Sequence, residues 1–212
     1  MATGLSLVLL LALRGDGVQA SNITVTVTND ELNTDGDCSL REAVQAANTD
    51  TAVDGCVAGA GPDTILLPAG TYALSITNAA PAGENANLSG DLDLNSVLTI
   101  SGAGAGATVI DGGQIDRVFH LLQASEATIS GLTIRNGLST NGGGILASTA
   151  TLSLESVTVS DNRADTGGGI SSSATGFTFS GVTVTGNTAT GVFSGGGGIF
   201  NSTASGIISN ST

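Results

Sequence analysis

The arginine and aspartate side chains of this sequence are the ones that could catalyse polysaccharide cleavage. A lyase needs a base, commonly Lys or Arg, and a hydrolase needs paired carboxylates at the scissile bond. The chain has no Lys, and Arg135 is the best-placed candidate base because its predicted position on a strand points outward. The neighbouring acids occur singly, so we expect no catalytic residue. Solvated charges are the better interpretation of Arg41, Arg117, Asp111, Asp116, Asp161 and Asp165.

The acidic stretch before residue 40 could bind calcium. Its letters DELNTDGD place Asp30, Asp35 and Asp37 close to a glycine, and Ca²⁺ prefers oxygen ligands. We interpret the spacing as different from that of an EF-hand loop, because Gly36 comes too early in the loop and no Glu stands at its twelfth position. Turn formation and the positive end of a following helix explain Asp35 and Asp37 without an ion. We therefore expect no cofactor, with calcium as the alternative.

His120, in the segment RVFHLLQ, could act as a general acid or base. The surrounding apolar residues favour a strand, in which this histidine either points outward or finds a hydrogen-bond partner. A second acidic segment, ENANLSGDLDL, could add oxygen ligands: Glu84, Asp91 and Asp93.

The second half of the chain repeats itself, and this repeat predicts the element that carries these residues. Apolar residues recur 25 positions apart in two series, and each of three Gly-Gly-Gly triplets is followed by Ile. A period in the twenties with alternating strands and glycine turns indicates a solenoid, here a right-handed parallel β-helix. Asparagines in the turns are expected to form a ladder. The series are Ile129, Leu154 and Phe179; Ile134, Val159 and Val184; and the ladder Asn136, Asn162 and Asn187.

One amphipathic helix is predicted within DGDCSLREAVQAAN, residues 35–48. Ser39 and Glu42 have the spacing of a capping box. The apolar residues Leu40, Ala43, Val44 and Ala47 form one stripe. Because a solenoid exposes core and strand edges at its end, we expect this helix to act as a structural cap.

The two cysteines and the N-terminus indicate export. Residues 1–20 resemble a signal peptide, with an apolar run followed by Val-Gln-Ala. Cys38 and Cys56 are expected to form a disulfide, which fits an oxidising compartment, and two free thiols are the alternative. A net charge of −13 argues against nucleic acid as a partner, and we expect no transmembrane segment in the mature chain.

The stretch TVTVTNDELNTDGDCSLREAVQAANTD, followed by DTILLPAGTYALSI, resembles the CSLREA domain. The glycine and asparagine repeats resemble those of polymorphic outer-membrane proteins. The resemblance implies a pectate-lyase-like β-helix and export to the bacterial cell envelope or outer membrane, without one fixed activity. We expect a signal peptide (1–20), a cap with the first coil (21–76) and β-helix repeats (77–212) that continue beyond Thr212.

The function predicted from these features is that of a secreted or cell-surface structural segment, similar to an adhesin, without catalysis of its own. Its partner would be an extracellular carbohydrate or a surface protein of a host or neighbouring cell. The alternative is the N-terminal part of a polysaccharide lyase or glycoside hydrolase that acts on an acidic polysaccharide.

Overall fold

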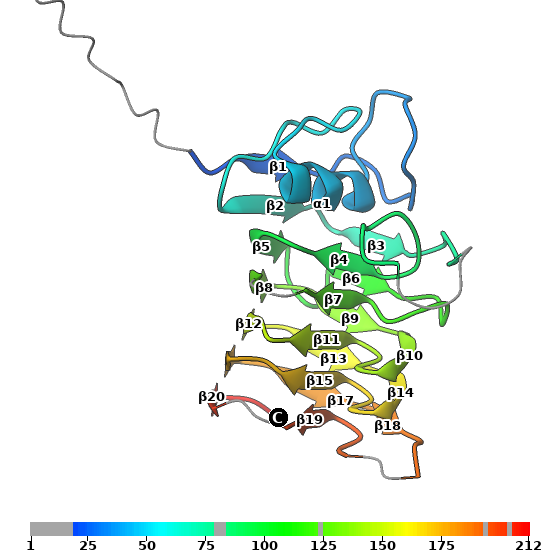
Figure 1. The fold of residues 1–212 in the computed structure, drawn as a ribbon, viewed down its shortest axis with the longest axis vertical. Coiled ribbons are helices and arrows are strands. Elements are labelled where there is room, and N and C mark those ends of the chain that lie inside the picture. Colours follow the sequence, from blue (N-terminus) through cyan, green and yellow to red (C-terminus); the bar gives the residue numbers. More distant parts are fainter. Residues whose placement is uncertain (1–18, 79–83, 123–124, 193–194, 203–204) are drawn as a thin grey trace, which may run out of the picture.

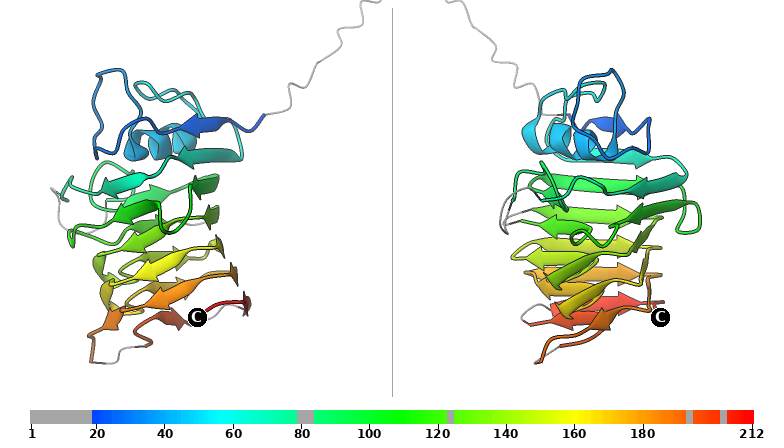
Figure 2. Two further views of the ribbon diagram at one scale, coloured as in Figure 1. Left: turned by 180° about the vertical axis from the view of Figure 1, so that it is seen from behind. Right: turned by 90° about the vertical axis from the view of Figure 1, so that its right-hand side faces the viewer.

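The computed structural model describes residues 19–78, 84–122, 125–192, 195–202 and 205–212. The predicted signal peptide, apart from Gln19 and Ala20, lies outside this part of the chain. Successive coils of parallel strands stack along one axis (Figures 1 and 2), so the predicted parallel β-helix with an N-terminal helix is confirmed.

Within the described ranges, the strands form four parallel sheets. The seven-stranded sheet contains β1 (Asn22–Thr24), β2 (Asp63–Leu67), β5 (Val97–Gly102), β8 (Glu126–Ser130), β12 (Thr151–Glu155), β16 (Gly176–Ser180) and β20 (Ser205–Ser209). A five-stranded sheet contains β3 (Gly70–Ala73), β6 (Thr108–Asp111), β9 (Thr133–Arg135), β13 (Thr158–Ser160) and β17 (Thr183–Thr185). A second five-stranded sheet contains β4 (Leu92–Leu94), β7 (Phe119–Leu121), β11 (Ile145–Ser148), β15 (Ile170–Ser173) and β19 (Ile199–Asn201). A three-stranded sheet contains β10 (Leu138–Asn141), β14 (Arg163–Thr166) and β18 (Thr188–Ala189).

The 25-residue period sets the strand register. Ile129, Leu154 and Phe179 are register partners in β8, β12 and β16, and all three side chains are buried. Ile134, Val159 and Val184 pair in the same way in β9, β13 and β17. Alternate side chains along each strand therefore stack into apolar columns, and these columns form the core.

The glycine triplets are structural, as their sequence predicted. Gly142 and Gly167 begin two of them at φ 59° and 61°, a conformation that glycine adopts without strain. A Cβ atom on Gly143 would clash with the carbonyl oxygen of Arg163 in the next coil. Close stacking of the coils at this corner therefore requires glycine.

The helix α1 (Leu40–Thr49) caps the solenoid (Figure 1). Ser39 Oγ accepts the Glu42 N–H at 3.2 Å, and Glu42 Oε2 accepts the Ser39 N–H at 2.9 Å, so the capping box is present. The predicted stripe packs into the core with β1, β2 and β4 as neighbours; its members Leu40, Ala43, Val44 and Ala47 are all buried. The disulfide between Cys38 and Cys56 is confirmed, and it ties the start of α1 to the turn that follows the helix.

The expectation that Arg41 is a solvated charge is wrong, because this residue is 0% exposed. Its guanidinium pairs with Asp30 at 2.6 Å and donates to the carbonyl oxygens of Gly90 and Asp91. None of the helices in the described ranges is long and apolar enough to span a membrane.

Candidate functional site

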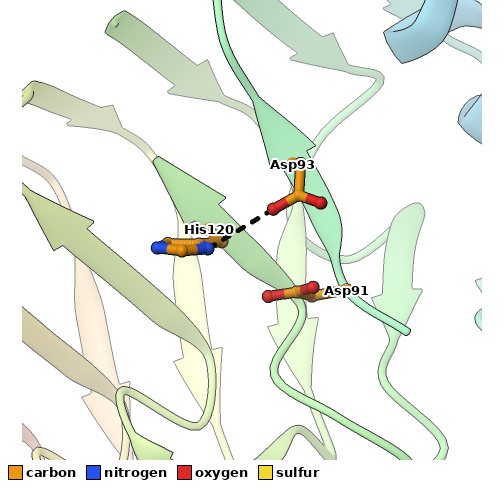
Figure 3. A group of neighbouring side chains, drawn as sticks. All are labelled: Asp91, Asp93 and His120. Carbon is orange, nitrogen blue, oxygen red and sulfur yellow. Dashed lines mark ion pairs between the residues drawn. The ribbon is translucent and has the colours of Figure 1, made fainter. Parts of the chain in front are cut away.

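Asp91, Asp93 and His120 form the most concentrated group of chemically competent side chains on the second five-stranded sheet (Figure 3). Leu92 and Leu94 point into the core, so the aspartates that alternate with them lie on the outer face. His120 on β7 is the register partner of Asp93 on β4. Each residue offers a ligand atom within 4.8 Å of the others, and His120 Nδ1 lies 3.3 Å from Asp93 Oδ1.

The two aspartates of this group are buried, with exposed fractions of 3% for Asp91 and 0% for Asp93. Arg117 Nε lies 3.1 Å from Asp91 Oδ2, and the Asn87 N–H donates to Asp93 Oδ2 at 3.0 Å. Burial raises the pKa of Asp91 to about 8, the charge of Asp93 adds to this effect, and Arg117 opposes it. The raised pKa of Asp91 means that this buried carboxyl favours its protonated form at neutral pH.

This group could exchange a proton or hold a metal ion that accepts nitrogen and oxygen ligands, such as Zn²⁺. Arg117 already compensates part of the negative charge, however. A ligand outside the protein would meet His120 first, since its side chain is 14% exposed while the aspartates lie beneath. His120 thus lies on the outer face of β7, which is one of the two arrangements expected from its sequence.

Arg135, the candidate base, lies in an ion pair on the outer face of β9. Its Nε donates to Asp111 Oδ2 at 2.9 Å, and Asn136 Nδ2 donates to the same oxygen at 2.9 Å. Burial alone would raise the pKa of Asp111, but hydrogen bonds from the Gly113 N–H, Arg135 and Asn136 hold it below the usual value. The paired carboxylate stabilises the charged guanidinium, so this geometry does not make Arg135 a base.

The cap loop, residues 31–37, places several carboxylates next to those of Glu42 and Asp54. Ligand oxygens of Glu31, Asp35 and Asp37 lie within 4.8 Å of one another, and so do those of Asp37, Glu42 and Asp54. We call these five residues the cap-loop cluster. Two of the calcium candidates from the sequence, Asp35 and Asp37, belong to it.

Asp30, the third calcium candidate, was assigned wrongly to this group. Its carboxylate binds Arg41 and accepts the backbone N–H groups of Ser75 and Ile76 at 2.7 and 2.9 Å. These partners fix a side chain that is 3% exposed and leave it no part in the cluster.

The interpretation of the cap-loop spacing was also wrong, and the sequence held the missing signal. Counted from Glu31, Asn33 is third, Asp35 fifth, Gly36 sixth and Glu42 twelfth. This is the order of an EF-hand loop, with Glu in place of Asp at the first position.

The expected asparagine ladder includes only two of its three predicted members. Asn162 Nδ2 donates to Asn187 Oδ1 at 3.0 Å, and Asn162 Oδ1 accepts the Gly137 N–H of the preceding coil. Asn136 stands one position earlier in its coil, at φ 55°, and binds Asp111 instead. The corresponding φ > 0 position in the next coil is Asp161.

No protein-family model matches the chain, and neither a curated protein nor a solved structure is significantly similar to it. The resemblance to the CSLREA domain therefore stays a prediction from the motif.

Proposed function

We propose that this protein is a secreted or cell-surface β-helix that serves as a rigid, adhesin-like segment and catalyses no reaction itself. The observation that carries the proposal is the outer face of the seven-stranded sheet. From β2 to β16 this face presents two columns of side chains, with one member of each column per coil. The first column is Thr64, Thr99, Thr128, Ser153 and Thr178, and the second is Leu66, Ser101, Ser130, Glu155 and Ser180.

These columns suit the binding of an extended partner along the side of the solenoid. Successive strands of a sheet lie about 4.8 Å apart, so the hydroxyl groups recur at short, regular intervals. Each hydroxyl donates and accepts hydrogen bonds, and a short side chain loses little entropy when it is ordered. An extracellular carbohydrate or the extended surface of a cell-surface protein could match this repeat.

The disulfide in the cap is evidence for the proposal that this protein is exported. The disulfide between Cys38 and Cys56 is typical of proteins from oxidising compartments. Placement of this protein in the bacterial cell envelope, and its relation to the CSLREA domain, are part of the same proposal.

A second candidate function is that of the N-terminal part of a polysaccharide lyase or hydrolase. The proximity of Asp91, whose pKa is raised, to Asp93 favours it, because glycosidases use two carboxyl groups at the scissile bond. The burial of both groups puts this function second, since a substrate would first have to displace their covering residues.

Binding and turnover measured together separate the two functions. Beads that carry the chain would be tested for retention on neutral and acidic polysaccharides and on cell-surface protein, while new reducing ends and unsaturated uronates are followed. Thr128→Arg should lower retention at least about tenfold, whereas Thr158→Arg, on the neighbouring sheet, should leave it unchanged. Absence of retention of the unchanged chain would refute the scaffold proposal, and turnover lost in Asp91→Asn would establish the enzyme instead.

A further inference from the structure

We propose that the cap-loop cluster binds one calcium ion and that this ion fastens the N-terminal cap. The EF-hand order of residues 31–42 supplies oxygen ligands at the first, third, fifth and twelfth positions. Gly36, the sixth residue, has φ 96°, so the sharp turn that an EF-hand loop needs at this point is formed. The inference concerns the cap alone and holds whatever partner the sides of the solenoid bind.

The five carboxylates of the cluster meet around Asp37. Asp37 belongs to both groups of oxygens that lie within 4.8 Å of one another, one with Glu31 and Asp35 and the other with Glu42 and Asp54. The two groups come from the loop, from the first turn of α1 and from the turn after the helix. An ion among them would join three segments that the disulfide already holds close together.

Two carboxylate oxygens of the cluster are buried without a hydrogen-bond partner. Glu31 Oε1 and Asp37 Oδ1 are buried from solvent and have no hydrogen-bond donor, and buried polar atoms without a partner are rare in folded proteins. Glu42 is 0% exposed, and its two oxygens accept the backbone N–H groups of Asn33 and Ser39. Glu31 Oε1 and Asp37 Oδ1 are the atoms that need a positive partner to compensate their desolvation.

Among the described residues, no basic side chain forms an ion pair with any member of the cluster. The carboxylates of Glu31 and Asp37 also lie close to those of Asp35, Glu42 and Asp54, so their negative charges repel one another. Asn33 Nδ2 donates to Glu31 Oε2 and to Asp35 Oδ2, both at 3.0 Å, and so offsets only part of this repulsion.

The ligand chemistry selects calcium among the common metal ions. The side chains offer oxygen only, which disfavours Zn²⁺ and copper. Ca²⁺ takes six to eight oxygen ligands in flexible geometry, whereas Mg²⁺ demands a near-ideal octahedron. A cluster of five carboxylates on a loop and two flanking segments provides the number and the freedom that Ca²⁺ accepts.

Calorimetric titration of the full chain with CaCl₂, after treatment with EDTA, tests the proposal. We expect about one ion per chain and a midpoint of thermal unfolding that rises by about 5 °C in millimolar Ca²⁺. The same concentration of MgCl₂ should give a much smaller shift. Absence of binding to the folded chain would overturn the proposal.

The variant Asp37→Asn tests whether the Asp37 side chain binds calcium or only supports the structure of the loop. Without calcium this variant should be at least as stable as the unchanged chain, because it removes one of several mutually repelling charges. With calcium it should lose most of the thermal shift and bind at least about tenfold more weakly. Glu31→Gln should behave in the same way and provides a second variant if the first one misfolds.

Glu126→Gln is the matched control, because it removes the same unit of charge from an exposed residue on β8. It should retain the full response to calcium. An equal loss of response in the control and in both loop variants would mean that calcium only screens the negative charge of the whole chain, and it would overturn the site.

Discussion

The buried pair of Arg41 and Asp30 should be a major determinant of cap stability. Arg41 is 0% exposed, and the Asp30 side chain is 3% exposed. Two guanidinium nitrogens reach the two carboxylate oxygens at 2.6 and 3.1 Å. The same guanidinium donates to the backbone oxygens of Gly90 and Asp91 at 2.8 and 3.1 Å. One side chain therefore connects α1 to the loop that contains Asp30 and to the segment directly before β4.

Arg41→Ala should lower the free energy of unfolding by about 4 kcal/mol. Removal of one partner from a buried ion pair costs about 3–5 kcal/mol, because the remaining charge stays desolvated. The two carbonyl groups also lose their donor, which moves the expectation away from the lower end of that range. Arg41→Lys keeps the charge but loses the planar fork, so its cost should be intermediate.

Urea unfolding followed by far-UV circular dichroism measures these costs. Asp30→Asn should also destabilise the protein, and the double variant Asp30→Asn/Arg41→Ala should lose at least about 1 kcal/mol less than the two single changes together. Strictly additive costs, or a cost below about 1 kcal/mol for Arg41→Ala alone, would refute the assigned role of this pair.

Three further outcomes follow from the described contacts. Cys56→Ala opens a disulfide that joins residues 18 positions apart and should cost about 3 kcal/mol in the same urea assay; unchanged stability would contradict this. Asn162→Ala should cost about 3 kcal/mol, because the Asn162 side chain is buried (1% exposed) and hydrogen-bonds to backbone groups of the preceding coil. Asn136→Gly should cost less than about 1 kcal/mol, because Asn136 has φ 55°, a conformation that glycine adopts without strain. The lowered pKa of Asp111 means that its contribution to stability is present above the unfolded pKa of about 4 and is lost as the pH falls through the folded value. Arg135→Ala raises that folded pKa, so the stability difference between variant and unchanged chain should shrink from pH 5 to pH 2; a constant difference in urea midpoints would contradict this assignment.

Stacking of identical coils made most of the fold predictable. Residues 25 apart, such as Leu154 and Phe179, must become register partners when each coil has the same length. The same rule identifies the error in the asparagine ladder, because Asn136 and Asn162 are 26 residues apart and cannot occupy equivalent positions.

The earlier coils differ in length, and there the period gave no guidance. Thr99 on β5 pairs with Thr128 on β8, 29 residues further along the chain, and so belongs to the seven-stranded sheet. Only the hydrogen-bonded register of β5 and β8 assigns this residue to its face.

The sequence alone determined the solenoid, its apolar columns, the capped helix and the disulfide, because each depends on local spacing or on a constant repeat. The tertiary structure decided which charges are paired. Arg41 lies within a buried network, Asp91 and Asp93 meet His120 across two strands, and Asp54 joins the cap-loop cluster. Such pairs depend on coil length and on how the cap folds over the first coil, and the interaction between two charges depends on their separation in space and on their burial rather than on their distance along the chain.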